Sequence, residues 1–177
     1  MGCRREEATG MATTLSGPSV VFVRVKAGNV DRAMREIRRN KAVERVEPLL
    51  GPHDLVLTGT FKDFETLRKY SENLEAQEFC EGTVVYPTFE QWRREGKPEQ
   101  PWNAWALVKT DDIEAAKGEL KRISAVNRYY TTAGEYGLIV QLSAENPSEL
   151  QEAVMEELQK VEGVRRTETF PSIRAEE

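Results

Sequence analysis

Short apolar segments alternate with amphipathic segments over residues 19–89. The segment from Val20 to Lys26 is rich in β-branched and aromatic residues, which indicates a strand. Behind Asn29, a residue suited to a helix N-cap, apolar side chains recur at helical spacing as far as Ile37. Continued along the chain, this pattern predicts a β-α-β-β-α-β order, with elements over 20–26, 30–37, 43–50, 55–61, 64–74 and 83–89.

The second half of the chain repeats the first. Lys26 aligns with Lys109 at a shift of 83 positions, and near the end, where Gly82 aligns with Gly163, the shift becomes 81. A register shared by six elements indicates a tandem duplication of one unit. Further aligned pairs are Ile37 with Leu120, Gly51 with Gly134, Leu55 with Leu138, and Leu67 with Leu150.

Each half is predicted to form a split βαβ, or ferredoxin-like, unit of the α+β class. The helices of such a unit cover one face of its sheet, so Phe22, Trp105 and Leu107 would lie on an uncovered apolar face. Residues 90–102 reach on the order of 40 Å when extended, which lets the second sheet cover the first. We therefore expect the two sheets to pack face to face, so that one chain mimics a homodimer.

Composition divides the chain into segments. Residues 1–18 are small and polar without strand or helix periodicity, so we expect a disordered leader, within which Met11 is an alternative start. Charged residues with Gly96, Pro98 and Pro101 are typical of a linker. The predicted organisation is a leader over 1–18, a first repeat over 19–89, a linker over 90–102, a second repeat over 103–173 and a tail over 174–177.

Charge and cysteine content exclude several classes of protein. The net charge of −5 argues against direct nucleic-acid binding, which needs clustered Lys and Arg. No apolar run approaches the roughly 20 residues that span a bilayer, so we expect no membrane partner. Cys3 and Cys80 are the only cysteines of the sequence and make no disulfide framework, which is typical of a cytoplasmic protein.

Several short motifs resemble a known family. They are the segment Ala125–Tyr129, the loop Gly134–Leu138, the closing segment Glu162–Thr169, and the loop Gly51–Leu55 of the first repeat. In both position and order they resemble the effector-binding domain of the Lrp/AsnC (feast/famine) regulators, also called the RAM domain. The resemblance covers residues 20–89 and 103–173. It implies a dimeric α/β barrel, formed here within one chain, that binds amino acids or related small molecules near subunit interfaces.

The regulators of this family also carry an N-terminal helix-turn-helix. Only 18 polar residues precede the first predicted strand, too few for its three helices. We therefore expect a tandem RAM module without this element, which does not bind DNA directly. Family members assemble into dimers, tetramers or octamers, so the resemblance also implies a homo-oligomer.

The loop Gly51–Asp54 is the first candidate ligand site. Glycine lets the backbone approach a ligand closely, and the Asp54 carboxylate could accept hydrogen bonds from an ammonium group. The alternative is a hairpin turn in which Asp54 bonds backbone groups. Gly134 and Tyr136 mark the matching loop of the second repeat, where Gly137 replaces the carboxylate.

His53 is the sole histidine, so an ordinary zinc site is not expected. It could act as an acid or base or as an axial haem ligand, but a partly exposed loop residue is the simpler interpretation. We find no motif for a nucleophile, a phosphate loop or a dinucleotide, and we expect no catalytic residue, metal or cofactor.

Three functions remain open. The first is a stand-alone cytoplasmic regulatory module that binds an amino-acid-like effector and acts through a protein partner. The second is a small haem- or tetrapyrrole-related enzyme, because folds of this type include sirohaem decarboxylases; this rests on fold analogy. The third is a structural assembly module that uses exposed strand edges. The sequence favours the first.

Overall fold

The computed structural model describes residues 14, 15 and 17–172. The first repeat forms a four-stranded antiparallel sheet with the strand order β2-β3-β1-β4. This is the strand order of a ferredoxin-like unit. Its elements are β1 (Ser19–Val25), α1 (Val30–Arg38), β2 (Val43–Pro48), β3 (Leu55–Gly59), α2 (Phe64–Glu75) and β4 (Cys80–Tyr86).

The second repeat forms a five-stranded antiparallel sheet with the order β5-β7-β8-β6-β9. Apart from β5 the order matches that of the first sheet, so the duplication predicted from the sequence is confirmed. Its elements are β5 (Thr88–Arg93), β6 (Trp102–Thr110), α3 (Ile113–Leu120), β7 (Val126–Thr132), β8 (Leu138–Ala144), α4 (Pro147–Glu152) and β9 (Val164–Ser172). A π-helical turn (Ala153–Glu157) and a 3-10 turn (Leu158–Lys160) continue α4.

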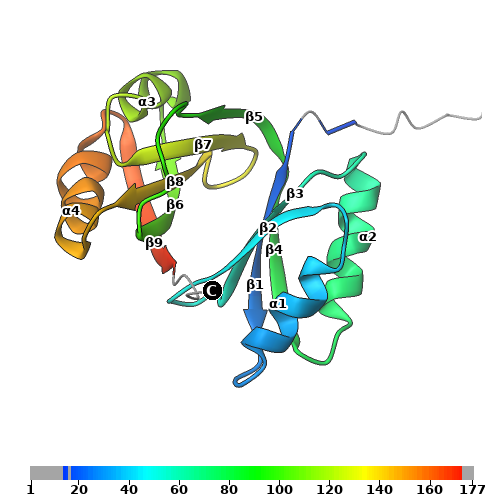
Figure 1. Ribbon diagram of the computed structural model, residues 1–177. Coiled ribbons are helices and arrows are strands. Elements are labelled where there is room, and N and C mark those ends of the chain that lie inside the picture. Colours follow the sequence, from blue (N-terminus) through cyan, green and yellow to red (C-terminus); the bar gives the residue numbers. More distant parts are fainter. Residues whose placement is uncertain (1–13, 16, 173–177) are drawn as a thin grey trace, which may run out of the picture.

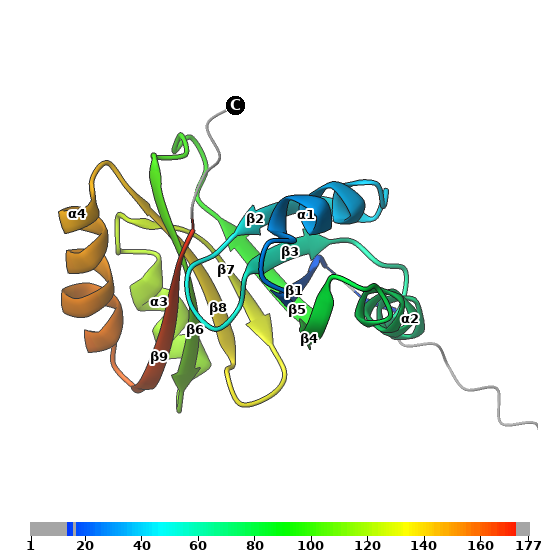
Figure 2. The ribbon, with the colours of Figure 1, turned by 90° about the horizontal axis from the view of Figure 1, so that it is seen from below.

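Each sheet packs its own helices against one face. The helix-facing core of the first repeat includes Val21, Val23 and Leu57, and that of the second includes Val108 and Val140. Alternate residues along these strands point the other way, because successive side chains of a strand lie on opposite faces. All four helices therefore lie on the outside of the molecule, as Figures 1 and 2 show.

A third core lies between the two sheets. Its centre is Trp105, which is 1% exposed and stacks on Tyr130 at a ring-centroid distance of 6.3 Å. Both repeats supply its members, so the two sheets bury each other's apolar faces, and the predicted intrachain dimeric α/β barrel of the α+β class is confirmed. This inter-sheet core consists of Val20, Phe22, Leu49, Val56, Trp105, Leu107, Tyr130, Tyr136, Ile139 and Phe170.

The structure differs from the sequence interpretation at the predicted linker. Residues 88–93 form β5, which follows β4 of the first sheet in the chain but pairs with β7 of the second sheet (Figure 1). The first residues of the predicted linker over 90–102 therefore belong to a strand. The strand was not predicted because most of its residues are exposed on a sheet edge, and their polar composition is typical of a linker. On the opposite side of the barrel, Leu49 forms a bridge with Ser172 of β9. Chain pairing therefore joins the two repeats on both sides.

The ends of the chain and two helix starts also differ in detail. Residues 1–13, 16 and 173–177, which include most of the predicted leader and the whole tail, lie outside the described residues. Thr14 forms a bridge with Asp63, so part of that leader contacts the first repeat. The spacing of Asp111 and Glu114 is that of a capping box and predicts Asp111 as the N-cap of α3. The N-cap is instead Asp112, which accepts from Ala115 N–H at 3.0 Å. Asn29 starts α1 without a side-chain cap bond. Among the described residues, no helix is long and apolar enough to cross a membrane.

Candidate functional site at the junction of the two repeats

The loop between β2 and β3 is held tightly against β9 and β1. Gly51 has a φ of +123°, and a Cβ there would lie 3.1 Å from a ring carbon of Phe170. Both the left-handed backbone and the close approach favour glycine. Asp54 accepts from Val25 N–H at 2.7 Å through Oδ2, and its own N–H donates to Val23 O at 2.9 Å. The Asp54 carboxylate thus bonds backbone, as in the structural alternative, although the backbone belongs to a neighbouring strand.

His53 lies in an aromatic cluster that spans the repeats. Its ring centroid is 5.4 Å from that of Phe22 and 5.5 Å from that of Phe170, and the two phenyl rings are 5.6 Å apart. Nδ1 is buried without a hydrogen-bond partner among the described residues. Burial, and secondarily the positive charge of Arg24, lowers the pKa of His53. The imidazole is therefore neutral at neutral pH.

Tyr136, in the loop of the second repeat between β7 and β8, contacts β9, the strand that also carries Phe170. Its Oη donates to Glu168 Oε1 at 2.6 Å, and Arg166 donates to the same oxygen at 2.9 Å. The bond to Glu168 raises the pKa of Tyr136 to about 12. Glu168 is also close enough to His53 and Tyr86 to act on the pKa of each. Tyr136, Glu168 and Arg166 therefore form a polar group beside the aromatic cluster.

The structure brings together some of the predicted site residues and separates others. His53 and Tyr136 are equivalent positions at the 83-residue shift, and both reach β9, at Phe170 and Glu168 respectively. Gly51 contacts the same strand. Gly134 is exposed and faces open space, so it shapes the second loop only.

Sequence reasoning missed the charged members of this junction site. These members lie on strands of both repeats: Arg24 on β1, and Arg166 and Glu168 on β9. The alternation of apolar and polar residues along a strand marks such residues only as polar positions. The available signal was that Arg166 and Glu168 fall within the closing segment that resembles the family. We define the junction site as Arg24, His53, Tyr86, Tyr136, Arg166 and Glu168.

A buried charged network between the sheets was also missed. Glu47 is 6% exposed and accepts from Trp105 Nε1 at 2.6 Å and from Arg45 Nε at 2.8 Å. Arg45 also pairs with Glu99 of the segment before β6. A buried carboxylate needs such partners because desolvation alone would be costly. The network ties β2 to β6 inside the barrel.

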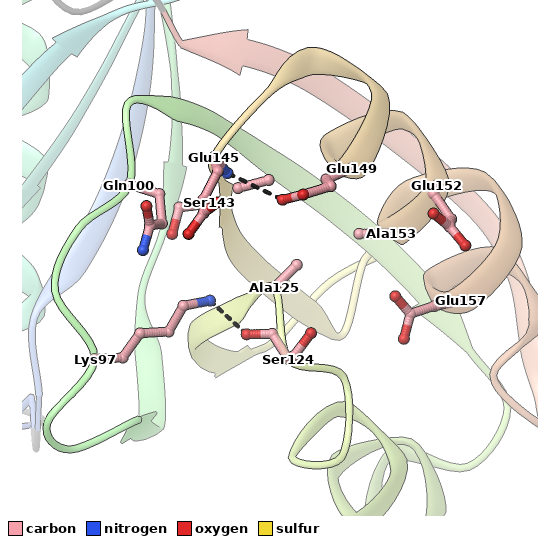
Figure 3. Close-up of a pocket in the computed structure, with 11 residues that line it drawn as sticks. Lys97, Gln100, Ser124, Ala125, Ser143, Glu145, Glu149, Glu152, Ala153 and Glu157 are labelled. Atoms are coloured by element: carbon pink, nitrogen blue, oxygen red, sulfur yellow. Dashed lines mark hydrogen bonds between the residues drawn. The ribbon is translucent and has the colours of Figure 1, made fainter.

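A separate cavity of about 440 Å³ opens at the end of the second repeat (Figure 3). Its lining contains none of the ligand-site residues predicted from the sequence. The cavity lies between the segment before β6, the start of β7, the end of β8, and α4 with its π-helical turn. Its lining is Lys97, Gln100, Ser124, Ala125, Ser143, Ala144, Glu145, Glu149, Glu152, Ala153 and Glu157.

This chain has the fold of a dimeric α/β barrel, in which two ferredoxin-like sheets pack against each other. Residues 106–176 match the family model of the Lrp/AsnC ligand binding domain, so the second repeat is a domain of that family. The first repeat shares its topology. A search of curated proteins finds no match.

Two solved structures show the same fold at low sequence identity. The siroheme decarboxylase NirDL is 9% identical with a TM-score of 0.68, and the match covers 93% of this chain and 77% of that one. A mutant of chlorite dismutase from Candidatus Nitrospira defluvii is 13% identical with a TM-score of 0.57, covering 89% and 90% of the two chains. At these identities the likeness concerns the fold alone.

Proposed function

We propose that this chain is a cytoplasmic regulatory module that binds an amino-acid-like effector at the junction site. One observation carries the proposal: equivalent loops of the two repeats converge on β9, with His53 against Phe170 and Tyr136 bonded to Glu168. A ligand at this point would contact both repeats at once. Its binding would therefore change how firmly the two halves are joined.

The side chains of the junction site suit a zwitterion. Glu168 can accept from an ammonium group through the oxygen that is not shared by Tyr136 and Arg166. Arg24, which is exposed and near His53, can bind a carboxylate. The rings of Phe22 and Phe170 are buried and pack against the His53 ring, which holds the imidazole in place. In this proposal Asp54 positions the loop through Val25 and does not contact the ligand.

Calorimetric titration with a panel of amino acids tests this proposal. We expect at least one amino acid to bind, and Glu168→Gln to weaken it by about tenfold or more, because the charge-assisted hydrogen bond is lost. Glu162→Gln, an exposed change just before β9, is the matched control and should leave the affinity unchanged. The absence of heat with every amino acid at millimolar concentration would refute the proposal.

We also propose that the module acts through a homo-oligomer and a protein partner. The support is the exposure of two large apolar side chains, Trp102 at 47% and Met155 at 49%. They line the same apolar groove, between α4 and the ends of β6 and β9. Light scattering should give a mass above that of one chain, 20.1 kDa, and Met155→Glu should lower it. A monomer at all concentrations would contradict the oligomer.

A tetrapyrrole enzyme is less well supported. NirDL is described as a siroheme decarboxylase and has also been solved with an iron-uroporphyrin III analogue, but only the fold is shared. Phe22 and Phe170 pack against His53 at ring-centroid distances of 5.4 and 5.5 Å, and Nδ1 of the imidazole is buried. A macrocycle could therefore not reach Nδ1 unless these groups moved. An absorbance titration with haemin should therefore show no change that depends on His53.

A further inference from the structure

A row of directly opposed side chains crosses the second sheet on its inter-sheet face. Arg93 of β5 lies opposite Arg128 of β7, and Arg128 lies opposite Gln141 of β8. Gln141 in turn lies opposite Trp105, the centre of the inter-sheet core. Directly opposed residues of neighbouring strands point to the same face of a sheet, so the two arginines and the glutamine share the inter-sheet face with Trp105.

The row leads from solvent into the interior of the barrel. Arg93 is exposed, Arg128 is partly buried, and Gln141 is 1% exposed. The outer end of the row is on β5, which forms one edge of the second sheet (Figure 1). A small ligand can therefore reach the row at this edge, while the inner groups of the row are desolvated, which strengthens their hydrogen bonds.

The two arginines place like charges side by side. Directly opposed residues have their Cβ atoms about 4.5–5.5 Å apart, and like charges in such a pair destabilise the sheet. Neither arginine forms an ion pair with any of the described residues. Glu47, which bonds Trp105 at the inner end of the row, is paired with Arg45, as is Glu99. Two positive charges of the row are thus left without a carboxylate of their own.

Two hydrogen-bond donors of the row are buried and unused. Arg128 Nε and Gln141 Nε2 have no hydrogen-bond partner in the described part of the chain. A guanidinium group has five N–H donors, and the side chain of Arg128 makes one hydrogen bond within the described residues, from Nη1 to Tyr130 Oη at 3.3 Å. Buried polar atoms are nearly always hydrogen-bonded, so two unused donors on directly opposed residues indicate an acceptor between them. The charges and the donors of the row favour the same group, an anion with several oxygens.

We propose that Arg93, Arg128 and Gln141 bind the phosphate group of a phosphate monoester. Such a group carries a charge of about −1.5 to −2 at pH 7 and three acceptor oxygens, which matches two guanidinium groups and one amide. The planar guanidinium binds phosphate through two parallel hydrogen bonds. A single carboxylate would leave one of the two cations without a counter-charge. This phosphate site goes beyond the junction site on β9, and its ligand would hold β5 against β7.

Titration calorimetry on the full chain near neutral pH tests the phosphate site with two isomers. Ethyl phosphate is a monoester, whereas dimethyl phosphate has the same atoms but is a diester with one negative charge. We expect ethyl phosphate to bind at one equivalent per chain and dimethyl phosphate to bind about tenfold more weakly or worse. Inorganic phosphate should bind about as well as ethyl phosphate, because the site recognises the phosphate group itself. Equal binding of the two isomers would overturn the proposal, as would no binding of ethyl phosphate at millimolar concentration.

Variants separate the phosphate site from general surface charge. Arg93→Gln and Arg128→Gln should each lower the affinity for ethyl phosphate by roughly an order of magnitude. Arg122→Gln, which removes the same charge from an exposed position after α3, is the matched control and should leave the affinity unchanged. An equal loss in the control would show diffuse attraction and refute the site. Arg93 is exposed, so Arg93→Gln still tests the site if Arg128→Gln does not fold.

NMR spectra locate the bound phosphate group. The Nε–H signal of Arg128 and the side-chain amide signals of Gln141 should shift on saturation with ethyl phosphate, and unchanged signals would contradict the proposal. Because Arg93 is exposed, the affinity should fall as ionic strength rises. Glu168→Gln should not affect phosphate binding, so this proposal and the junction site fail independently.

Discussion

Replacing Trp105 by alanine tests whether the two sheets stabilise each other through the inter-sheet core. A buried tryptophan removes about 150–250 Å² from water, and Trp105 is 1% exposed. At about 25 cal/mol per Å², its loss corresponds to about 4–6 kcal/mol of unfolding free energy. Large-to-small changes at buried tryptophans cost about 3–5 kcal/mol, which agrees.

Trp102→Ala is the matched control on the same strand. Trp102 is 47% exposed, so its side chain buries about half of that area. We therefore expect Trp102→Ala to lower the unfolding free energy by about 2 kcal/mol. Trp105→Phe isolates the hydrogen bond to Glu47, since it keeps an aromatic ring but removes the Nε1 donor. It should cost about 2–3 kcal/mol, because a buried carboxylate loses one of its partners.

Urea unfolding followed by circular dichroism measures all three variants, with the slope of the transition reporting the surface exposed on unfolding. If Trp105→Ala leaves too little folded protein to measure, Trp105→Phe still separates the two outcomes. The reasoning is refuted if Trp105→Ala costs no more than Trp102→Ala. That result would mean that the inter-sheet contact adds little to the stability of the separate repeats.

Three further predictions concern single residues. Gly51→Ala should lower the unfolding free energy by about 1–3 kcal/mol, because it combines a positive φ with a close contact to Phe170, whereas Gly134→Ala, with a φ of +126° in open space, should cost less. Asp112→Ala should cost about 1 kcal/mol through loss of the α3 N-cap, measured in the same urea assay. The pKa of His53 is lowered in the folded chain, so the unfolded chain binds more protons as the pH falls through and below the ordinary value of 6.5. The wild type should therefore lose unfolding free energy in this pH range relative to His53→Phe. Parallel pH profiles of the two proteins would contradict this prediction.

The sequence by itself determined the order of the elements and the duplication. Periods of two and near 3.6 arise from the geometry of each strand and helix, so they can be read locally without knowing what packs against them. Alternation sends Tyr129 and Tyr130 to opposite faces, and the structure places them in the helix-facing and inter-sheet cores respectively. The uncovered apolar sheet faces required a partner, and the second repeat was the one available within the chain.

Tertiary structure alone decided which side chains of the two repeats meet. Glu47 and Trp105 are 58 positions apart, and no local pattern pairs a glutamate of β2 with a tryptophan of β6. The junction site depends likewise on β9, which contacts His53 through Phe170 and Tyr136 through Glu168. The strand β5 joins the second sheet because its backbone finds an open edge on β7, although its composition is that of a linker. Such contacts follow from how two sheets cross and twist, and that geometry exists only after the whole chain has packed.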